Sequence, residues 1–422
     1  MKVLWLSSTS GLYKKKETRS LYNGCGWIDS LQRVVEGLAD VELGVVFLSK
    51  EGEGKDCQEG TTYYSIPQKK EKGLKKLFYY YRGYKKVRRQ EYVSEVQSII
   101  EDFKPDIIHL FGIENQLATI LGNTSIPVVV HLQGILTPCD NAFFPPGFNM
   151  DVFKWPMTTR EWIFRNGFGF AHRIIHVRSM REKELFKRVQ YAMGRTSWDR
   201  EMLQLFAPEA KYFHVDEILR EPFYANAGRW RCPEKGTFRI VSTLSQTVYK
   251  GLDLVLKVAK YLSTYTNLEF EWQVIGLPSN SPMIRFFERR TKIISKDVHV
   301  KYIGVRTSEE LTKDLLESNV YVHPSYIDNS PNSVCEAQIL GLPVVATAVG
   351  GVPSLVEDGE TGFLVPSNGL YEMAAALLRL ANDQSLADRI GKSASERACV
   401  RHCQQNVAKA LFSAYKKVKD NL

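Results

Sequence analysis

Long apolar runs are missing from this chain of 422 residues. No stretch approaches the roughly 20 apolar residues that a membrane-spanning helix needs. The opening apolar run, residues 3–6, is far shorter than the roughly 7 to 15 apolar residues of a secretory signal and favours a buried strand. We therefore expect a cytoplasmic protein that is either soluble or bound peripherally to the inner face of the cell membrane.

A cysteine framework is also missing. The chain has seven cysteines, an odd number, and their spacing follows no disulfide pattern, so we expect reduced thiols. Cys399, His402 and Cys403 lie close together near the end, but three potential ligands on one expected helix form an incomplete zinc set. We predict ordinary thiols there, no metal site and no cofactor.

Acidic residues are too few to balance the basic ones, which leaves a net charge of +9. The excess is concentrated in residues 68–90, which hold ten Lys or Arg and one Glu, a local net charge of +9. Outside this segment the chain is close to neutral, so a nucleic-acid-binding surface is not indicated.

The basic segment also carries apolar side chains, at Leu74, Leu77, Phe78, Tyr81 and Tyr84. This spacing is compatible with a helix that rests on anionic lipid. The loop 143–148, Phe-Phe-Pro-Pro-Gly-Phe, adds aromatic residues that we expect to be exposed. We therefore hypothesise peripheral contact with an anionic membrane. A solvated basic helix and a self-packed loop are the alternative.

Short apolar runs alternate with helical patterns, which is typical of parallel sheets with crossover helices. The expected strands are 2–6, 43–48, 107–110, 128–131, 174–177 and 212–215, and then 238–242, 272–275, 298–303, 320–323, 344–348 and 362–365. They predict two α/β, doubly wound domains, 1–222 and 236–403. We place the linker near Pro222, Gly228 and Pro233.

One segment, residues 328–336, has the composition of a ligand pocket at a helix start. It reads Asp-Asn-Ser-Pro-Asn-Ser-Val-Cys-Glu and directly follows the expected strand 320–323. Pro331 suits the first helical position and Ser330 the N-cap. The amides of Asn332, Ser333 and Val334 would then be free for an anion such as a diphosphate. Glu336 shares a face with Asn332 and can accept hydrogen bonds from hydroxyls.

Residues 337–353, Ala-Gln-Ile-Leu-Gly-Leu-Pro-Val-Val-Ala-Thr-Ala-Val-Gly-Gly-Val-Pro, continue this motif. The combined stretch resembles retaining GT-B glycosyltransferases of family four, in which two acids mark the donor site and a Gly-Gly-Val-Pro loop follows the next strand. Asp328 stands where the family usually has Glu, and Glu336 matches. The resemblance implies the GT-B fold, two Rossmann-like domains facing a cleft, with a last helix at 404–422 packing back on the first domain.

The resemblance extends to a lysine after the strand 238–242. Lys250-Gly251 opens an amphipathic helix, and in the family this lysine binds the donor phosphates. A surface lysine in a turn is the alternative. The family's second phosphate-binding cation, an Arg, is missing from Ser242-Thr243-Leu244. The implied donor contacts are Gly24, Gly26, Thr243, Ile303, Val305, Ser330, Asn332, Ser333 and Val334.

Acceptor candidates lie at strand ends in the first half. The strand 128–131 ends at His131 and leads to Gln133, which can hydrogen-bond a sugar hydroxyl but cannot act as a base. Arg178 and Arg195 are expected at strand-to-helix turns, where they could bind a phosphate bidentately or form salt bridges between loops. Arg195 lies in Gly-Arg-Thr-Ser-Trp-Asp-Arg, which resembles a signature of bacterial polysaccharide transferases. An ordinary strand-end histidine is the alternative for His131.

The chain contains no Asp-x-Asp, the acidic metal clamp of the other main transferase fold. The resemblance implies a metal-independent, retaining glycosyltransferase with Lys250, Asp328 and Glu336 as its catalytic set. It would move a sugar from a nucleoside diphosphate sugar, with UDP favoured, to a glycan or lipid-linked acceptor in surface polysaccharide synthesis. An epimerase or phosphorylase on the same fold, or a catalytically silent membrane-associated binding protein, are the alternatives.

Overall fold

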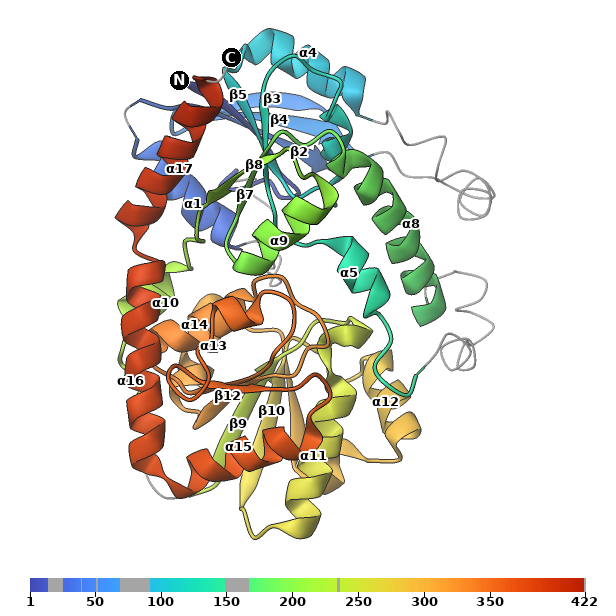
Figure 1. The fold of residues 1–422 in the computed structure, drawn as a ribbon, viewed down its shortest axis with the longest axis vertical. Coiled ribbons are helices and arrows are strands. Elements are labelled where there is room, and N and C mark those ends of the chain that lie inside the picture. The colour runs from blue at the N-terminus through green and yellow to red at the C-terminus, as the bar shows by residue number, and fades with distance from the viewer. Residues whose placement is uncertain are drawn as a thin grey trace.

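The computed structural model describes residues 1–13, 26–38, 40–50, 52–68, 92–148, 167–233 and 236–420. These residues form two α/β units, one above the other in Figure 1, each built on its own sheet. Gly24, and all of the basic segment except its first residue, lie outside the described residues. The hypothesis of a membrane-binding helix therefore stays a prediction.

The first unit is built on an eight-stranded sheet in the order β3-β4-β2-β1-β5-β6-β7-β8. All pairs are parallel except β3 with β4, which is antiparallel at one edge. Its elements are β1 (Lys2–Leu6), α1 (Gly26–Glu36), β2 (Glu42–Ser49), β3 (Gly54–Gln58), β4 (Thr61–Pro67), α4 (Val93–Phe103), β5 (Ile107–Phe111), η2 (Gln116–Ile120), β6 (Val128–His131), α5 (Leu136–Asn141), α8 (Phe168–Phe186), β7 (Tyr191–Gly194), α9 (Ser197–Phe206) and β8 (Lys211–His214).

The second unit is a six-stranded, all-parallel sheet in the order β11-β10-β9-β12-β13-β14. A short helix, α10 (Glu221–Ala225), precedes it. The elements of the second unit are β9 (Phe238–Thr243), η3 (Val248–Lys250), α11 (Leu252–Tyr265), β10 (Phe270–Ile275), α12 (Pro282–Thr291), η4 (Ser295–Val298), β11 (Val300–Gly304), α13 (Ser308–Leu316), β12 (Val320–His323), α14 (Asn332–Leu340), β13 (Val344–Thr347), η5 (Val352–Ser354), β14 (Phe363–Val365), α15 (Leu370–Asn382) and α16 (Gln384–Arg401). The last helix, α17 (Gln404–Lys419), follows α16 and returns to the first unit.

The strands form where short apolar runs can be covered on both faces. β12, for example, is buried at all four positions, as parallel strands between two helical layers are. The strand order reverses beside β1 in the first sheet and beside β9 in the second. Open parallel sheets bind ligands past the carboxyl ends of their strands at such reversal points.

One predicted strand, 174–177, is wrong. These residues lie inside α8, a 19-residue helix. The run Ile-Ile-His-Val looks like a strand in isolation, because a short apolar run cannot be assigned by periodicity alone. The long helix-favouring sequence on its C-terminal side decides the outcome. Arg178 therefore lies within a helix and not at a strand-to-helix turn, and β7 supplies the strand instead.

The last two helices run along one side of both units, α16 beside the second and α17 beside the first (Figure 1). The packing of α17 on the first unit is centred on Tyr415, which is fully buried. Trp5 Nε1 donates to the Tyr415 hydroxyl at 3.1 Å, and His109 Nδ1 lies 2.6 Å from the same oxygen. The C-terminal helix thus completes the core of the N-terminal unit.

The aromatic residues of the loop 143–148 are buried or half-buried, contrary to the prediction that they are exposed. Phe143 is 1% exposed and belongs to the core of the second unit, against Tyr249 at a ring distance of 6.1 Å. Phe148 lies 5.9 Å from Phe287 of α12. These rings therefore fasten a loop of the first unit to the second, because apolar side chains from a distant segment are available to cover them.

None of the helices in the described part of the chain combines the length and the apolar character that crossing a bilayer requires.

Candidate active site

A cleft of about 360 Å³ lies between the two units and is lined by residues just past the strand ends. Eleven of the residues predicted from the sequence line it: Gly26, Gln133, Arg195, Thr243, Lys250, Val305, Asp328, Ser330, Asn332, Ser333 and Glu336. The side chains of Ile303 and Val334 pack instead against the core of the second unit.

The start of α14 differs by one residue from the prediction. Pro331 is the N-cap, with φ −71° and ψ 109°, and not the first helical residue. Ser330 does not cap the helix, since its buried hydroxyl has no partner among the described residues. The amide of Val334 donates to the carbonyl of Pro331 at 3.0 Å. The amides left at this helix end for a ligand are therefore those of Asn332 and Ser333.

Asp328 lies at the centre of the charged groups in the cleft. Lys250 Nζ donates to Asp328 Oδ2 at 2.5 Å, and His323 Nε2 lies 3.1 Å from the same oxygen. Although burial opposes it, Lys250 and His323 hold the pKa of Asp328 well below its usual range. Asp328 is therefore an anion at neutral pH, held between Lys250 at the end of η3 and His323 at the end of β12.

Two glycine contacts fix this arrangement. Gly251 has φ +81°, and a Cβ there would lie 2.0 Å from the carbonyl oxygen of Pro324. Gly350 has φ +52°, and a Cβ there would lie 1.9 Å from the carbonyl oxygen of Asp328. Only glycine permits this close approach of the backbones. The loops that carry Lys250 and Asp328 are thereby packed directly against their neighbours.

Glu336, one turn into α14, is 4% exposed and pairs with Arg220. Arg220 Nε and Nη2 each lie 2.8 Å from Glu336 Oε1. Burial raises the pKa of Glu336, and Arg220 opposes that shift. Arg220 precedes α10 in the segment that joins the two sheets, and no motif in the sequence marked it.

Arg195 reaches across the cleft from the first unit to the second. Its Nη1 donates to Asn332 Oδ1 at 3.3 Å, at the start of α14. Its position is fixed because Asp199 accepts from the amides of Arg195 and Thr196 at 2.8 and 3.1 Å. Thr196 and Asp199 form the capping box of α9, so part of the Gly-Arg-Thr-Ser-Trp-Asp-Arg motif is a helix start that aims Arg195.

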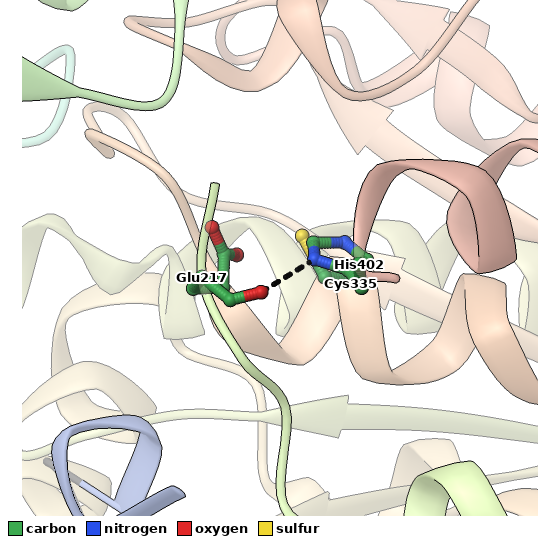
Figure 2. A group of neighbouring side chains, drawn as sticks. All are labelled: Glu217, Cys335 and His402. Atoms are coloured by element: carbon green, nitrogen blue, oxygen red, sulfur yellow. Dashed lines mark hydrogen bonds between the residues drawn. The ribbon is translucent and has the colours of Figure 1, made fainter. Parts of the chain in front are cut away.

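Behind Arg195 lies a group of three buried side chains, Glu217, Cys335 and His402, drawn in Figure 2. Their potential ligand atoms lie within 4.8 Å of one another. His402 Nδ1, however, bonds to the backbone carbonyl of Glu217 at 3.0 Å, and the carboxylate lies 3.6 Å from Arg195 Nη1. A cation would have to share the carboxylate with this guanidinium, so the arrangement favours a buried ion pair at the junction of the units over a metal centre.

Two acceptor candidates do not reach the cleft lining. His131 is fully buried, with its Nδ1 at 3.2 Å from His109 Nε2, and burial, His109 and Arg195 lower its pKa well below the usual value. Arg178 donates to the backbone carbonyl of Glu114 at 2.9 Å. Gln133 does line the cleft, and its buried Nε2 has no partner among the described residues.

Among the charged or titratable residues that line the cleft, sequence reasoning missed three, Arg220, His323 and Arg306. Arg306 follows β11, and its Nε donates to Asp314 at 2.8 Å. The signal for His323 was its place at the end of β12, five residues before Asp328. Arg220 gave no signal, because its contact with Glu336 joins residues 116 apart.

Residues 230–397 match the family model described as "Glycosyl transferases group 1". The C-terminal unit is a group 1 glycosyl transferase domain. This domain contributes Lys250, Asp328 and Glu336 to the cleft, whereas Gln133, Arg195 and Arg220 come from outside it.

Curated relatives match in part. The "Amylovoran biosynthesis glycosyltransferase AmsK" of Erwinia amylovora is 27% identical over 196 residues, 44% of this chain and 46% of that protein. A "D-inositol 3-phosphate glycosyltransferase" of Corynebacterium kroppenstedtii is 29% identical over 208 residues, 46% of each. The match thus spans under half the length of either relative.

Solved structures match over the whole chain. Sucrose-phosphate synthase from Thermosynechococcus elongatus has a TM-score of 0.71 at 13% identity and covers 100% of both chains. Anabaena Alr3699/HepE in complex with UDP and glucose has a TM-score of 0.63 at 15% identity and covers 99% of both. The two sheets of this chain, with the cleft between them, form the GT-B fold of these glycosyltransferases.

Proposed function

We propose that this protein is a retaining glycosyltransferase that takes a sugar from a nucleoside diphosphate sugar. The observation that carries the proposal is the meeting of Lys250, Asp328 and Glu336 in one cleft at the start of α14, inside a group 1 domain. UDP is the preferred donor nucleotide, in keeping with the UDP bound by Anabaena HepE in the same fold. The proposed acceptor is a glycan or a lipid-linked sugar used in surface polysaccharide synthesis.

The cleft has the charge that a diphosphate requires. Lys250 supplies an ammonium group, and the amides of Asn332 and Ser333 point out of the positive end of the α14 dipole. Arg195 adds a guanidinium from the opposite unit, beside Asn332. An entering diphosphate would exchange the Lys250–Asp328 contact for its own and would lie beside Arg195 of the first unit.

The same groups fit the charges that develop during transfer. As the glycosyl bond breaks, positive charge grows on the sugar and negative charge on the leaving diphosphate. Lys250 and the helix amides stabilise the leaving group without a divalent ion, Asp328 positions the donor sugar, and Glu336 holds the ribose. We propose that the acceptor attacks from the face that the diphosphate leaves, and that the departing phosphate takes the acceptor proton.

On the acceptor side, Gln133 follows β6 and lines the cleft. Its side-chain amide nitrogen has no partner among the described residues, so we propose that it donates to an acceptor hydroxyl. We propose that the protein works in the cytoplasm, held peripherally on the inner membrane face by the basic segment 68–90. Flotation of the full chain with vesicles containing phosphatidylglycerol, in low salt only and not with neutral vesicles, is the expected result. Equal recovery with both vesicle types would reject membrane binding.

The function is tested first by a thermal-shift screen against nucleoside diphosphate sugars. A donor at about 100 times its dissociation constant stabilises the folded protein by about 2.7 kcal/mol. With the identified donor, added glycan acceptor should release free nucleoside diphosphate, and EDTA should not change the rate. Release of a sugar phosphate instead would indicate a phosphorylase, interconversion of donors an epimerase, and binding without any turnover a silent binding protein.

A further inference from the structure

Arg220 makes an unusual contact for a residue in an interdomain segment. It comes directly before α10, between the last strand of the first sheet and the first strand of the second. From there it lines the cleft and places Nε and Nη2 on a single oxygen, Glu336 Oε1, at 2.8 Å each. The side chains of Arg220 and Glu336 are 15% and 6% exposed, so this pair is shielded from bulk water.

The contact uses only one of the two carboxylate oxygens. Glu336 Oε2 receives no hydrogen bond from any residue that the structure describes, although Glu336 lines the cleft. Two nitrogens of the Arg220 guanidinium approach the other oxygen, Oε1, and together they fix the orientation of the Glu336 carboxylate. The second oxygen is thereby left as an acceptor for a ligand that carries hydroxyl groups.

The surroundings of Glu336 otherwise favour its neutral form. Burial and the nearby Glu217 raise the pKa of Glu336, and Arg220 is the cation that lowers it. Arg195 pairs with Glu217 and so is already committed to another carboxylate. A carboxyl group that carried a proton would lose part of its capacity to accept hydrogen bonds from hydroxyls.

We propose that Arg220 is a positioning residue that keeps Glu336 ionised and holds Oε2 ready for the ribose hydroxyls of a nucleoside diphosphate. This inference rests on the proposed function, because it requires a nucleotide donor. It assigns the interdomain segment a direct part in nucleotide selection, in addition to joining the two sheets.

The test compares UDP with 2′,3′-dideoxy-UDP by isothermal titration calorimetry. We expect the wild-type protein to prefer UDP by about tenfold or more, the worth of a hydrogen bond to a charged group. Arg220→Ala and Glu336→Gln should each lose this preference, and the double variant should bind like Glu336→Gln alone. Because each ratio is taken within one variant, partial unfolding lowers both affinities alike and cancels.

The pH dependence separates positioning from packing. In Arg220→Ala the preference for UDP should return partly as the pH is raised, since Glu336 then loses its proton without the help of Arg220. Arg220→Lys should keep part of the preference at neutral pH, and the double variant should show no pH dependence. Arg401→Ala is the matched control, because Arg401 also binds α14, through Gln338 at 3.0 Å, from outside the cleft.

The inference is overturned if Arg220→Ala keeps the wild-type preference for UDP. It is also overturned if the double variant loses more of that preference than either single variant, because the two residues would then act independently. It is also overturned if Arg401→Ala loses the preference to the same extent, since disturbance of α14 would then explain the effect. A wild-type protein that binds neither UDP, GDP nor ADP would contradict the proposed function itself, and this inference with it.

Discussion

The two units differ in how far neighbouring residues determine their structure. In the second unit every strand was predicted to within two residues, and Lys250, Asp328 and Glu336 each lie between the end of a strand and the first turns of the helix that follows it. The first unit has an antiparallel edge strand, and its core is closed by α17 from the other end of the chain. The structure of the second unit therefore follows largely from local sequence, while the structure of the first unit depends on contacts between residues far apart in sequence.

The largest effect is expected when the ammonium group of Lys250 is removed from the donor side. We expect Lys250→Ala to lower turnover by about 100-fold or more, because the leaving diphosphate loses its nearest cation. Steady-state rates with the identified donor measure this. Lys301→Ala, which removes an exposed lysine paired with Glu271 far from the cleft, should turn over normally. Near-normal rates in Lys250→Ala would remove the donor assignment.

Substitutions at Gly251 and Gly304, which have nearly the same φ, distinguish the cost of backbone strain from the cost of a steric clash. Gly251 and Gly304 have φ of +81° and +82°, but a Cβ at Gly304 would meet nothing within 4 Å, whereas at Gly251 it would lie 2.0 Å from a carbonyl oxygen. Gly304→Ala should lower the free energy of unfolding by about 1–2 kcal/mol. Gly251→Ala should lower it by about 3 kcal/mol or more. Urea unfolding measures both, and equal losses would contradict the packing argument.

The contribution of contacts between distant residues to the stability of the first unit is tested at Tyr415. Tyr415→Phe removes the hydroxyl that meets Trp5 and His109, and we expect a loss of about 1–3 kcal/mol in the free energy of unfolding. Burial lowers the pKa of His109 to about 3, so the contact joins neutral groups and the loss should not vary between about pH 6 and 8. Lys409→Ala, on the exposed face of α17, should change stability little.

The smallest effect is expected in acid. Because the pKa of Asp328 is lowered in the folded protein, Asp328 contributes stability above its unfolded pKa of about 3.9. That stability is lost as the pH falls through the acid range. Urea unfolding between about pH 3 and 6 should therefore show a flatter pH dependence in Asp328→Asn than in the wild-type protein. An unchanged slope would mean that the contacts with Lys250 and His323 are weak in solution.

The sequence predicted the fold because short apolar runs in a doubly wound protein are buried on both faces and stand out from their surroundings. It missed β3, β4 and β7 of the first sheet, although β4 and β7 are mostly buried. β3, Gly-Lys-Asp-Cys-Gln, is an edge strand that is mostly exposed and has no apolar pattern. The run 174–177 is apolar but lies in a helix, because its neighbours favour helix over a longer span.

The site was predictable to the extent that its residues follow strands in sequence. Lys250, Asp328 and Glu336 belong to motifs of the second unit, and all three line the cleft. Arg220 could not be found, because what places it is a contact with a helix 116 residues later. His131 was predicted as an acceptor candidate because it ends a strand. In the fold, Trp27 and His109, which are distant in sequence, bury it.

The position of Tyr415 has a consequence for the order of events during synthesis. Trp5 and His109 emerge from the ribosome about 300 residues or more before their partner on α17 does. Until that helix appears, one face of the first sheet is covered by α1 but lacks α17, so the core of the earliest half of the polypeptide is the last to close. Truncation within residues 404–419 would leave that nascent surface permanently open and available to chaperones.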